Sequence, residues 1–267
     1  MRVPSTQRGN ILLERRIVPR GDRLLGLVQT FRGTDTRTAV THNAVVMARI
    51  KVLEGKLSLP LRSGTVIAPR SFLLVLPPHS VLPMAFEAAH VWSEGVACFS
   101  DSLAEASLND ASLTRALLTE DTALLSDRQH GQDVLPGNRV AMARMLTSGI
   151  WKRLDADAGV AQPIVQARRL LHHLISHPAP VRTAASSVGI CAETISRGFS
   201  CAYKLSPKQY CHRARLHEAV LRLIAGATII DAAFDAGFCD LKRFYNQFKR
   251  LLGVTPGAYT HIKKRQD

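Results

Sequence analysis

The C-terminal half contains twice the pattern of a short helix, a glycine turn and a second helix, and this repetition constrains the fold most strongly. In the first copy, we expect a helix over 182–188, a turn at Gly189 and a second helix over 192–203. Ala185 is small, as two closely packed helices require. The pattern predicts a helix-turn-helix unit over about 181–203.

The second copy begins with a short helix expected over 229–236, followed by a turn at Gly237. Asp240 is a good N-cap for the helix expected over 241–252, because its carboxylate accepts a bond from a free backbone N–H. The second unit is therefore predicted over about 228–252. A helix that begins at Pro207 connects the two units.

In each unit, the second helix has an apolar face for the core and a polar face for solvent or a partner. The N-terminal part of such a helix fits the major groove of double-stranded DNA, where its side chains meet base edges. Some of the polar residues could instead contact phosphate alone, or nothing. The predicted DNA-binding residues are Glu193, Thr194, Ser196, Arg197, Lys242, Arg243, Asn246 and Lys249.

The charge of the chain supports a polyanionic partner. The chain has 35 Lys and Arg against 21 Asp and Glu, a net charge of +14, which favours nucleic acid or an anionic membrane surface. Residues 160–267 hold 16 basic and 6 acidic residues, and residues 1–159 hold 19 and 15. The C-terminal part is therefore expected to meet phosphates.

The two units share further residues with one family. The second unit has Ala233, Gly237, Phe238, Phe244, Phe248, Lys249, Gly253, Thr255, Pro256 and Tyr259. The first has Ala185, Ile195, Arg197, Phe199, Ser206, Pro207, Tyr210, Arg215 and Ala219. With these residues, about 165–262 resembles the DNA-binding domain of the bacterial AraC/XylS transcription regulators. The resemblance implies two recognition helices in successive major grooves, about 34 Å apart, and activation through contact with RNA polymerase.

Three positions depart from the family pattern. Cys191 stands where a Ser or Thr cap is usual, and a thiol is a poor capping acceptor. Lys204 replaces a usual glycine, and Thr260 replaces a usual arginine. Two of these departures, Cys191 and Lys204, lie at the two ends of the helix expected over 192–203.

The N-terminal half is β-rich over about 10–100, with short apolar runs separated by turns, and helical over about 101–155. Val52–Leu57 and Phe72–Pro78 are similar to strands of the cupin-like barrel that precedes the DNA-binding domain in this family. We therefore predict a multidomain chain with a β-rich cupin-like barrel and trailing helices. This effector-binding or dimerisation domain occupies 1–160, and an all-α double helix-turn-helix domain occupies 161–267.

Five arginines are candidates for binding a small-molecule effector. Arg49, Arg62 and Arg70 could anchor an anionic ligand, although solvated surface arginine is the more common role. Arg16 and Arg20 resemble a pattern of some cyclic-dinucleotide binders, which a basic chain also produces by chance. The helices expected between 102 and 154 form either a homodimer seam or a layer on the barrel of their own chain.

No metal or cofactor is predicted, because His42, His79 and His90 are scattered and are best explained as surface or core histidines. The five cysteines form no Cys-x-x-Cys pair, which indicates reduced thiols. A cupin enzyme would need clustered ligands, and a repair alkyltransferase would need a Pro-Cys-His motif, whereas Cys211 follows Tyr210. The chain is therefore not expected to be an enzyme.

No apolar signal segment or membrane span is evident, so we expect a cytoplasmic, nucleoid-associated protein without a membrane partner. The combined prediction is a sequence-specific activator controlled by a small-molecule effector or by dimerisation. The alternatives are an effector-independent regulator and a cupin-type enzyme.

Overall fold

The β-rich composition of the N-terminal half produces one antiparallel sheet. The computed structural model describes residues 2–8, 11–20, 24–61, 64–99, 124–126, 151–154 and 156–264. Three long strands form the middle of the sheet: β3 (Leu24–Val40), β7 (Val81–Phe99) and β4 (Ala44–Leu61). The other strands are β1 (Arg2–Arg8), β2 (Ile11–Arg20), β5 (Gly64–Ile67), β6 (Ser71–Leu76), β8 (Leu124–Ser126) and β9 (Trp151–Arg153).

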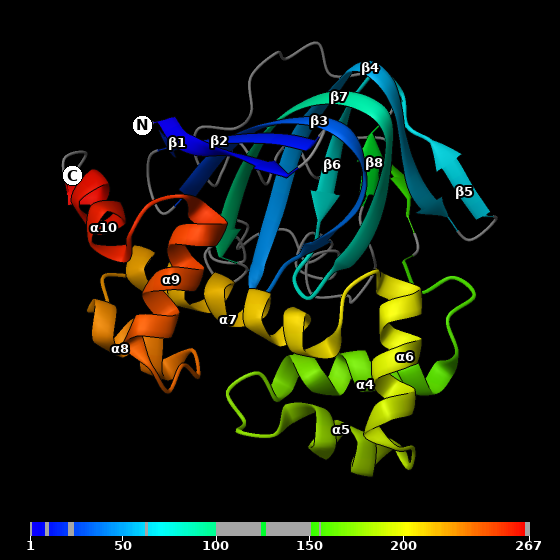
Figure 1. Cartoon of the computed structure of the whole chain (residues 1–267), viewed down its shortest axis with the longest axis vertical. Helices are drawn as coiled ribbons and strands as arrows, with labels where there is room; N and C mark the ends of the chain where they lie inside the picture. Colours follow the sequence, from blue (N-terminus) through cyan, green and yellow to red (C-terminus); the bar gives the residue numbers. More distant parts are fainter. Residues whose placement is uncertain are drawn as a thin grey trace, which may run out of the picture.

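The strand order is β1-β2-β3-β7-β4-β6-β8-β9, with β5 paired to β4. Figure 1 shows the long central strands arching above the helices. The sheet bends at Gly55, where the β4–β7 register shifts between Glu54 and Lys56. Gly55 has a φ of 67°, and a Cβ there would lie 2.2 Å from the carbonyl oxygen of Ala88. Only glycine fits this close approach of two strands.

The predicted β-rich region is confirmed, but the described strands do not show a closed barrel. The order of the strands ends at β1 on one side and at β9 on the other, and no pairing joins these two within the described residues. Side chains of Leu57, Leu59 and Phe72 form part of the buried core under the sheet. Closure into a cupin-like barrel stays a prediction.

Helices were expected between 102 and 154, and the two pieces of this segment that the structure describes are strands instead. Leu124 pairs with Arg153, and β8 also pairs with β6 along Leu73–Val75. The helical prediction is wrong at these residues, because the backbone groups at the edge of β6 offer a pairing that overrides local propensity. The rest of the expected helical region, including the possible dimer seam, lies outside the described residues.

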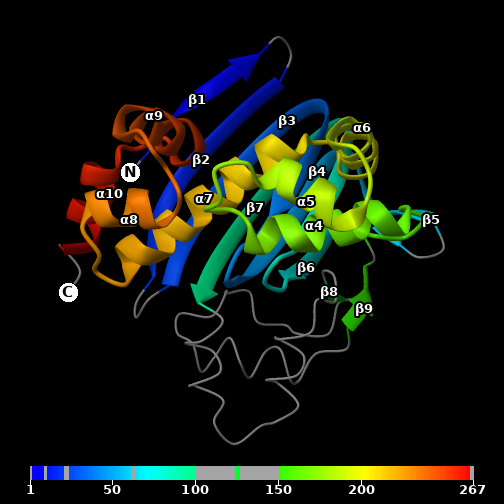
Figure 2. The same ribbon diagram turned by 90° about the horizontal axis from the view of Figure 1, so that it is seen from below.

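The C-terminal half is all-helical. Its helices are α4 (Gln162–His173), α5 (Pro180–Val188), α6 (Ala192–Tyr203), α7 (Pro207–Ile224), α8 (Ile229–Asp235), α9 (Leu241–Leu252) and α10 (Pro256–Lys264). In Figure 2, α7 connects a group formed by α4, α5 and α6 with a group formed by α8, α9 and α10. Within the described residues, no helix is long and apolar enough to cross a bilayer.

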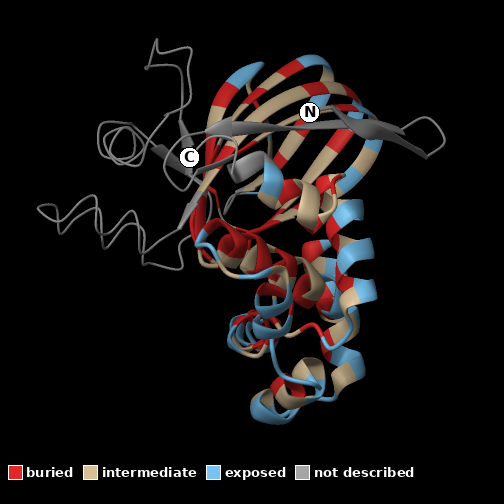
Figure 3. Ribbon diagram, turned by 90° about the vertical axis from the view of Figure 1, so that its left-hand side faces the viewer, coloured by how far each residue is buried: buried red, intermediate tan, exposed pale blue. Residues whose placement is uncertain are grey.

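The sheet packs directly on the helices. The Thr38 hydroxyl on β3 donates to the carbonyl of Tyr203 at 2.5 Å, and the Arg213 guanidinium on α7 donates to the carbonyl of Thr38. Val40 and Val81, at the helix-facing ends of β3 and β7, belong to one buried cluster with residues of α4, α6 and α7. In Figure 3, buried residues line this junction, and exposed residues lie on the outer sides of the helices.

Candidate nucleic-acid interface

The first helix-turn-helix unit is fixed by small and apolar residues between α5 and α6. Ala185 and Ile195 are buried together with Ala167 of α4. Gly189 adopts a left-handed φ of 76° and turns the chain between the two helices. Because these contacts occupy the inner side of α6, its polar side faces outward.

Two charged side chains stand out on this outward face of α6. Glu193 and Arg197 are 78% and 77% exposed and lie 3.6 Å apart as an ion pair one helical turn apart. An ion pair this exposed contributes less than about 1 kcal/mol to the stability of the fold. Both side chains can therefore leave the pair and contact DNA instead. Thr194 is also exposed, whereas Ser196 is half-buried and its hydroxyl donates to the Ala192 carbonyl at 2.8 Å. Ser196 is therefore the least available of the four.

The thiol of Cys191 caps α6 despite its weakness as an acceptor. Its Sγ accepts from the backbone N–H of Thr194 at 3.4 Å and lies 3.0 Å from the Thr194 hydroxyl. These hydrogen bonds, the side-chain one first, lower the pKa of the Cys191 thiol. The helix therefore begins at Ala192, although the usual Ser or Thr is missing.

Replacement of Lys204 by glycine is expected to stabilise the protein. Lys204 ends α6 with φ 55° and ψ 26°, a left-handed conformation that costs a residue with a Cβ about 1–2 kcal/mol. Lys204→Gly should raise the free energy of unfolding by about 1 kcal/mol, measured by urea denaturation. Lys208→Gly, at an exposed lysine in the first turn of α7, is the matched control and should lower it. Equal changes in the free energy of unfolding would show that the left-handed conformation of Lys204 is not the cause.

The second unit is built around aromatic rings. Phe244 contacts Phe238 at a ring distance of 5.1 Å and Phe248 at 5.5 Å, and Phe248 contacts Tyr259 of α10 at 5.8 Å. Asp240 caps α9, since its carboxylate accepts from the Lys242 N–H at 2.8 Å, as the sequence predicted. These contacts hold α9 so that its polar face points away from the core.

All four residues predicted on α9 are exposed: Lys242, Arg243, Asn246 and Lys249. The guanidinium of Arg243 lies 3.1 Å from Nε2 of His212 on α7. Burial, followed by the nearby charge of Arg243, lowers the pKa of His212 to about 4. The neutral imidazole can accept from Arg243 and orient it.

The two polar faces lie at opposite ends of α7 (Figure 1). This helix has 18 residues, which corresponds to a length of about 27 Å. It begins with a capping box between Ser206 and Gln209. Arg215 in its middle donates to the carbonyls of Ile175 and His177, which ties α7 to the segment between α4 and α5. The spacing of the units is therefore set by a helix anchored along its length.

The described effector candidates bond within the sheet. The Arg49 guanidinium lies 3.3 Å from the Glu94 carboxylate on the neighbouring strand. Arg70 donates to the carbonyls of Val52, Leu53 and Gly55 at 3.4–3.5 Å, where β4 bends. A ligand role for these arginines stays a prediction. The remaining candidates have side chains outside the described residues: Arg16, Arg20 and Arg62.

The structure brings together three histidines that sequence spacing did not associate. His42 from the β3–β4 loop, His79 from the β6–β7 turn and His172 from α4 form one cluster, whereas His90 lies apart beside Arg32. No motif connects positions so far apart in the chain. The only sequence signal was that His42 and His79 each follow a strand, next to turn residues.

Cys211, the cysteine that the structure describes on α7, does not have the properties of an activated nucleophile. Cys211 is 3% exposed, and burial raises the pKa of its thiol to about 11. Three other described cysteines are exposed and form no disulfide: Cys191, Cys201 and Cys239. A thiol with a raised pKa is a poor nucleophile at neutral pH.

Comparison with known proteins identifies the helical half. Residues 184–261 match the family model described as a helix-turn-helix domain, which covers α6–α9 and most of α5 and α10. No curated protein sequence matches the chain.

Several solved structures are similar in shape. ToxT from Vibrio cholerae is 15% identical, with coverage of 90% of this chain and 98% of that one, and a TM-score of 0.44. A probable AraC family regulator from Rhodopseudomonas palustris is 23% identical (38% and 96% coverage, TM-score 0.35). The DNA-binding domain of AdpA in complex with a target DNA is 24% identical (39% and 96%, TM-score 0.35).

Proposed function

We propose, from the premise that residues 184–261 are an AraC-type helix-turn-helix domain, that the chain regulates transcription by binding double-stranded DNA sequence-specifically through α6 and α9. The observation that carries this proposal is the pair of outward polar helix faces at the two ends of α7. A rigid spacer of about 27 Å with a helix across each end can serve two major grooves about one turn of B-DNA apart.

Different residues on these faces suit different contacts. Arg197 and Arg243 can each donate two bonds to guanine, and Asn246 can bond adenine in the same bidentate way. Glu193 can accept from the amino group of cytosine. Lys242 is a further candidate for base contact. The proposal assigns Thr194, Ser196 and Lys249 to the same interface, with Lys249 on phosphate.

The test compares a base-reading arginine with a phosphate-binding lysine. A binding site is first selected from a random duplex library with the full-length protein. Arg197→Ala should then weaken binding to this site by about 1–3 kcal/mol and relax specificity at one base position. Lys249→Ala should weaken binding to every sequence alike and reduce the slope of affinity against salt by about 1. Fluorescence anisotropy across salt concentrations measures both.

Lys56→Ala, an exposed lysine on β4 away from both recognition helices, removes the same charge and should leave the selected site and its affinity unchanged. The assignment of Arg197 fails if Arg197→Ala selects the same sequence with unchanged stringency. Sequence-specific binding itself fails if the wild-type protein enriches no sequence.

We further propose that residues 1–160 form an effector-binding or dimerisation domain of cupin-like type, and that the DNA-bound protein activates RNA polymerase. Two hydrogen bonds join the sheet to α6 and α7: Thr38 donates to Tyr203, and Arg213 donates to Thr38. They support the separate roles proposed for the sheet and the helices. A change in the sheet can therefore reach the DNA-binding helices. Light scattering of the purified protein with and without DNA tests dimerisation.

A further inference from the structure

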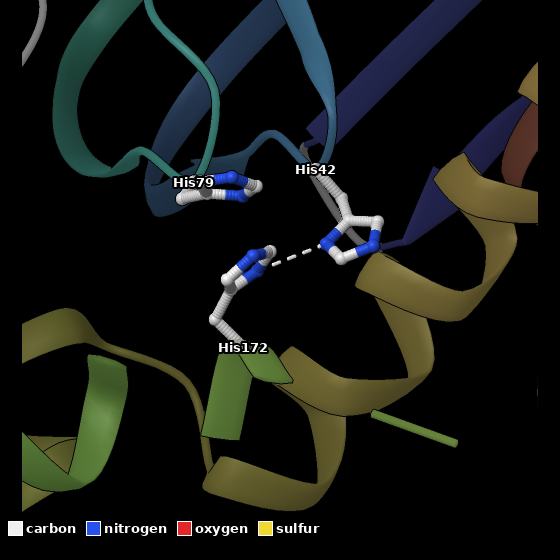
Figure 4. Close-up of side chains that lie close together, drawn as sticks. All are labelled: His42, His79 and His172. Atoms are coloured by element: carbon white, nitrogen blue, oxygen red, sulfur yellow. Dashed lines mark hydrogen bonds between the residues drawn. The ribbon is translucent and has the colours of Figure 1, made fainter. Parts of the chain in front are cut away.

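Three imidazole rings converge where the sheet meets α4. His42 lies in the loop after β3, His79 in the turn after β6, and His172 near the end of α4 (Figure 4). The Nδ1 atoms of His42 and His172 are 3.0 Å apart, and one nitrogen of each of the three rings lies within 4.8 Å of the others.

Imidazole has an ordinary pKa of about 6.5, so histidine is mostly neutral at pH 7 and then has a lone pair to donate to a metal ion. Nδ1 of His79 is buried and has no hydrogen-bond partner within the described residues. A buried polar atom without a partner is uncommon, and a coordinated cation would satisfy it.

The geometry suits a tetrahedral ion. Zinc–nitrogen bonds of about 2.0–2.1 Å place two ligand nitrogens about 3.3 Å apart. The separation of 3.0 Å between His42 and His172 is close to this value. The rings of His79 and His172 have centroids 3.3 Å apart, so they must turn for one nitrogen of each to face the same ion. Three histidines leave the fourth position of a tetrahedral ion for water.

The surroundings also favour a cation. Nε2 of His42 lies 3.5 Å from the Glu218 carboxylate on α7, which can hold the proton on Nε2 and leave Nδ1 for the metal. Arg168 donates to the backbone carbonyl of His79 at 3.0 Å, but its charge is paired with Asp157 at 2.7 Å. The positive charge of Arg168 is therefore balanced by Asp157, which reduces its repulsion of a bound cation.

We propose that His42, His79 and His172 bind one divalent transition-metal ion of the zinc class, which ties the N-terminal sheet to the first helix of the C-terminal half. Neutral imidazole ligands select such ions over Mg²⁺ and Ca²⁺, which prefer oxygen. Two ligands come from loops of the sheet and one from α4, so the site is complete only when the two are docked. Metal binding therefore stabilises the docked arrangement.

The experiment uses full-length protein that has been treated with a chelator and then dialysed. Titration calorimetry with ZnCl₂ should show one equivalent bound per chain, and the melting temperature should rise on addition of the metal. His172→Ala should weaken zinc binding roughly 100-fold or more. His79→Gly should do the same without backbone strain, because residue 79 has a φ of 64°, which glycine adopts freely.

His261→Ala removes an exposed histidine of α10 and is the matched control, with unchanged zinc affinity and stoichiometry. Cobalt(II) spectra separate this site from the exposed cysteines, because thiolate ligands add a charge-transfer band in the near ultraviolet that imidazoles do not. Unchanged binding in both His172→Ala and His79→Gly would overturn the proposal. A thiolate band in the one-equivalent cobalt complex would overturn it as well.

Discussion

Replacement of Asp157 by alanine is expected to lower the free energy of unfolding by about 3–5 kcal/mol, because it leaves the charge of Arg168 buried without its partner. The Arg168 side chain is 7% exposed, and its guanidinium lies 2.7 Å from the Asp157 carboxylate. The Tyr203 hydroxyl donates to the other carboxylate oxygen at 2.6 Å. Burial raises the pKa of Tyr203, which keeps this hydroxyl protonated as a donor. Chemical denaturation followed by circular dichroism measures the loss.

The more accessible pair of Asp35 and Arg37 provides the comparison. Their side chains are 35% and 31% exposed, so Asp35→Ala should cost less than about 1 kcal/mol. The double variant Asp157→Leu, Arg168→Leu should be more stable than Asp157→Ala, because it removes the buried charge together with its partner. If Asp157→Ala costs no more than Asp35→Ala, the buried pair does not hold the junction together.

The network around Asp157 matters because it joins four parts of the chain. Asp157 belongs to the segment between β9 and α4, Arg168 to α4 and Tyr203 to α6, and Arg168 also bonds the carbonyl of His79 in the sheet. The first recognition helix is therefore bonded to the connection between the two halves. The proposed metal site lies at the same junction, and His79 belongs to both, since its carbonyl accepts from Arg168.

The helix-turn-helix units were predictable because their signals are local. Gly189 and Gly237 both adopt positive φ values where the sequence placed turns, and Asp240 caps the helix that it was expected to begin. A cap or a turn acts within three or four residues, so sequence spacing contains the necessary information. Cys191 is instructive, since the position keeps its capping role with a thiol in place of a hydroxyl.

The parts that sequence could not predict depend on distant contacts. Leu124–Ser126 reads as helical by composition, but its backbone pairs with β6, and no local pattern reveals that the edge of β6 needs a partner. Likewise, His42, His79 and His172 are on three elements that meet only after the sheet has docked on α4. Periodicity shows which face of an element is buried, not which loops come together.

Phe244→Ala is expected to disable the second recognition helix. Phe244 is fully buried between Phe238 and Phe248, and truncation of a core phenylalanine costs about 3–5 kcal/mol. Tyr245, its neighbour on α9, is 38% exposed, so Tyr245→Ala is the stability control and should cost far less. The melting temperature of each variant provides the comparison.

The DNA footprint distinguishes loss of one unit from loss of the whole domain. The first unit has its own core, in which Phe199 packs on Tyr203 and Tyr210 at ring distances of 4.7 and 5.6 Å. Phe244→Ala should therefore shorten protection of the selected site from two adjacent major grooves to one, with a large loss of affinity. A footprint of unchanged length would show that α9 does not occupy a groove. Protection that vanishes at every protein concentration would show that the two units form one cooperative core, in which α6 cannot bind DNA once α9 is released.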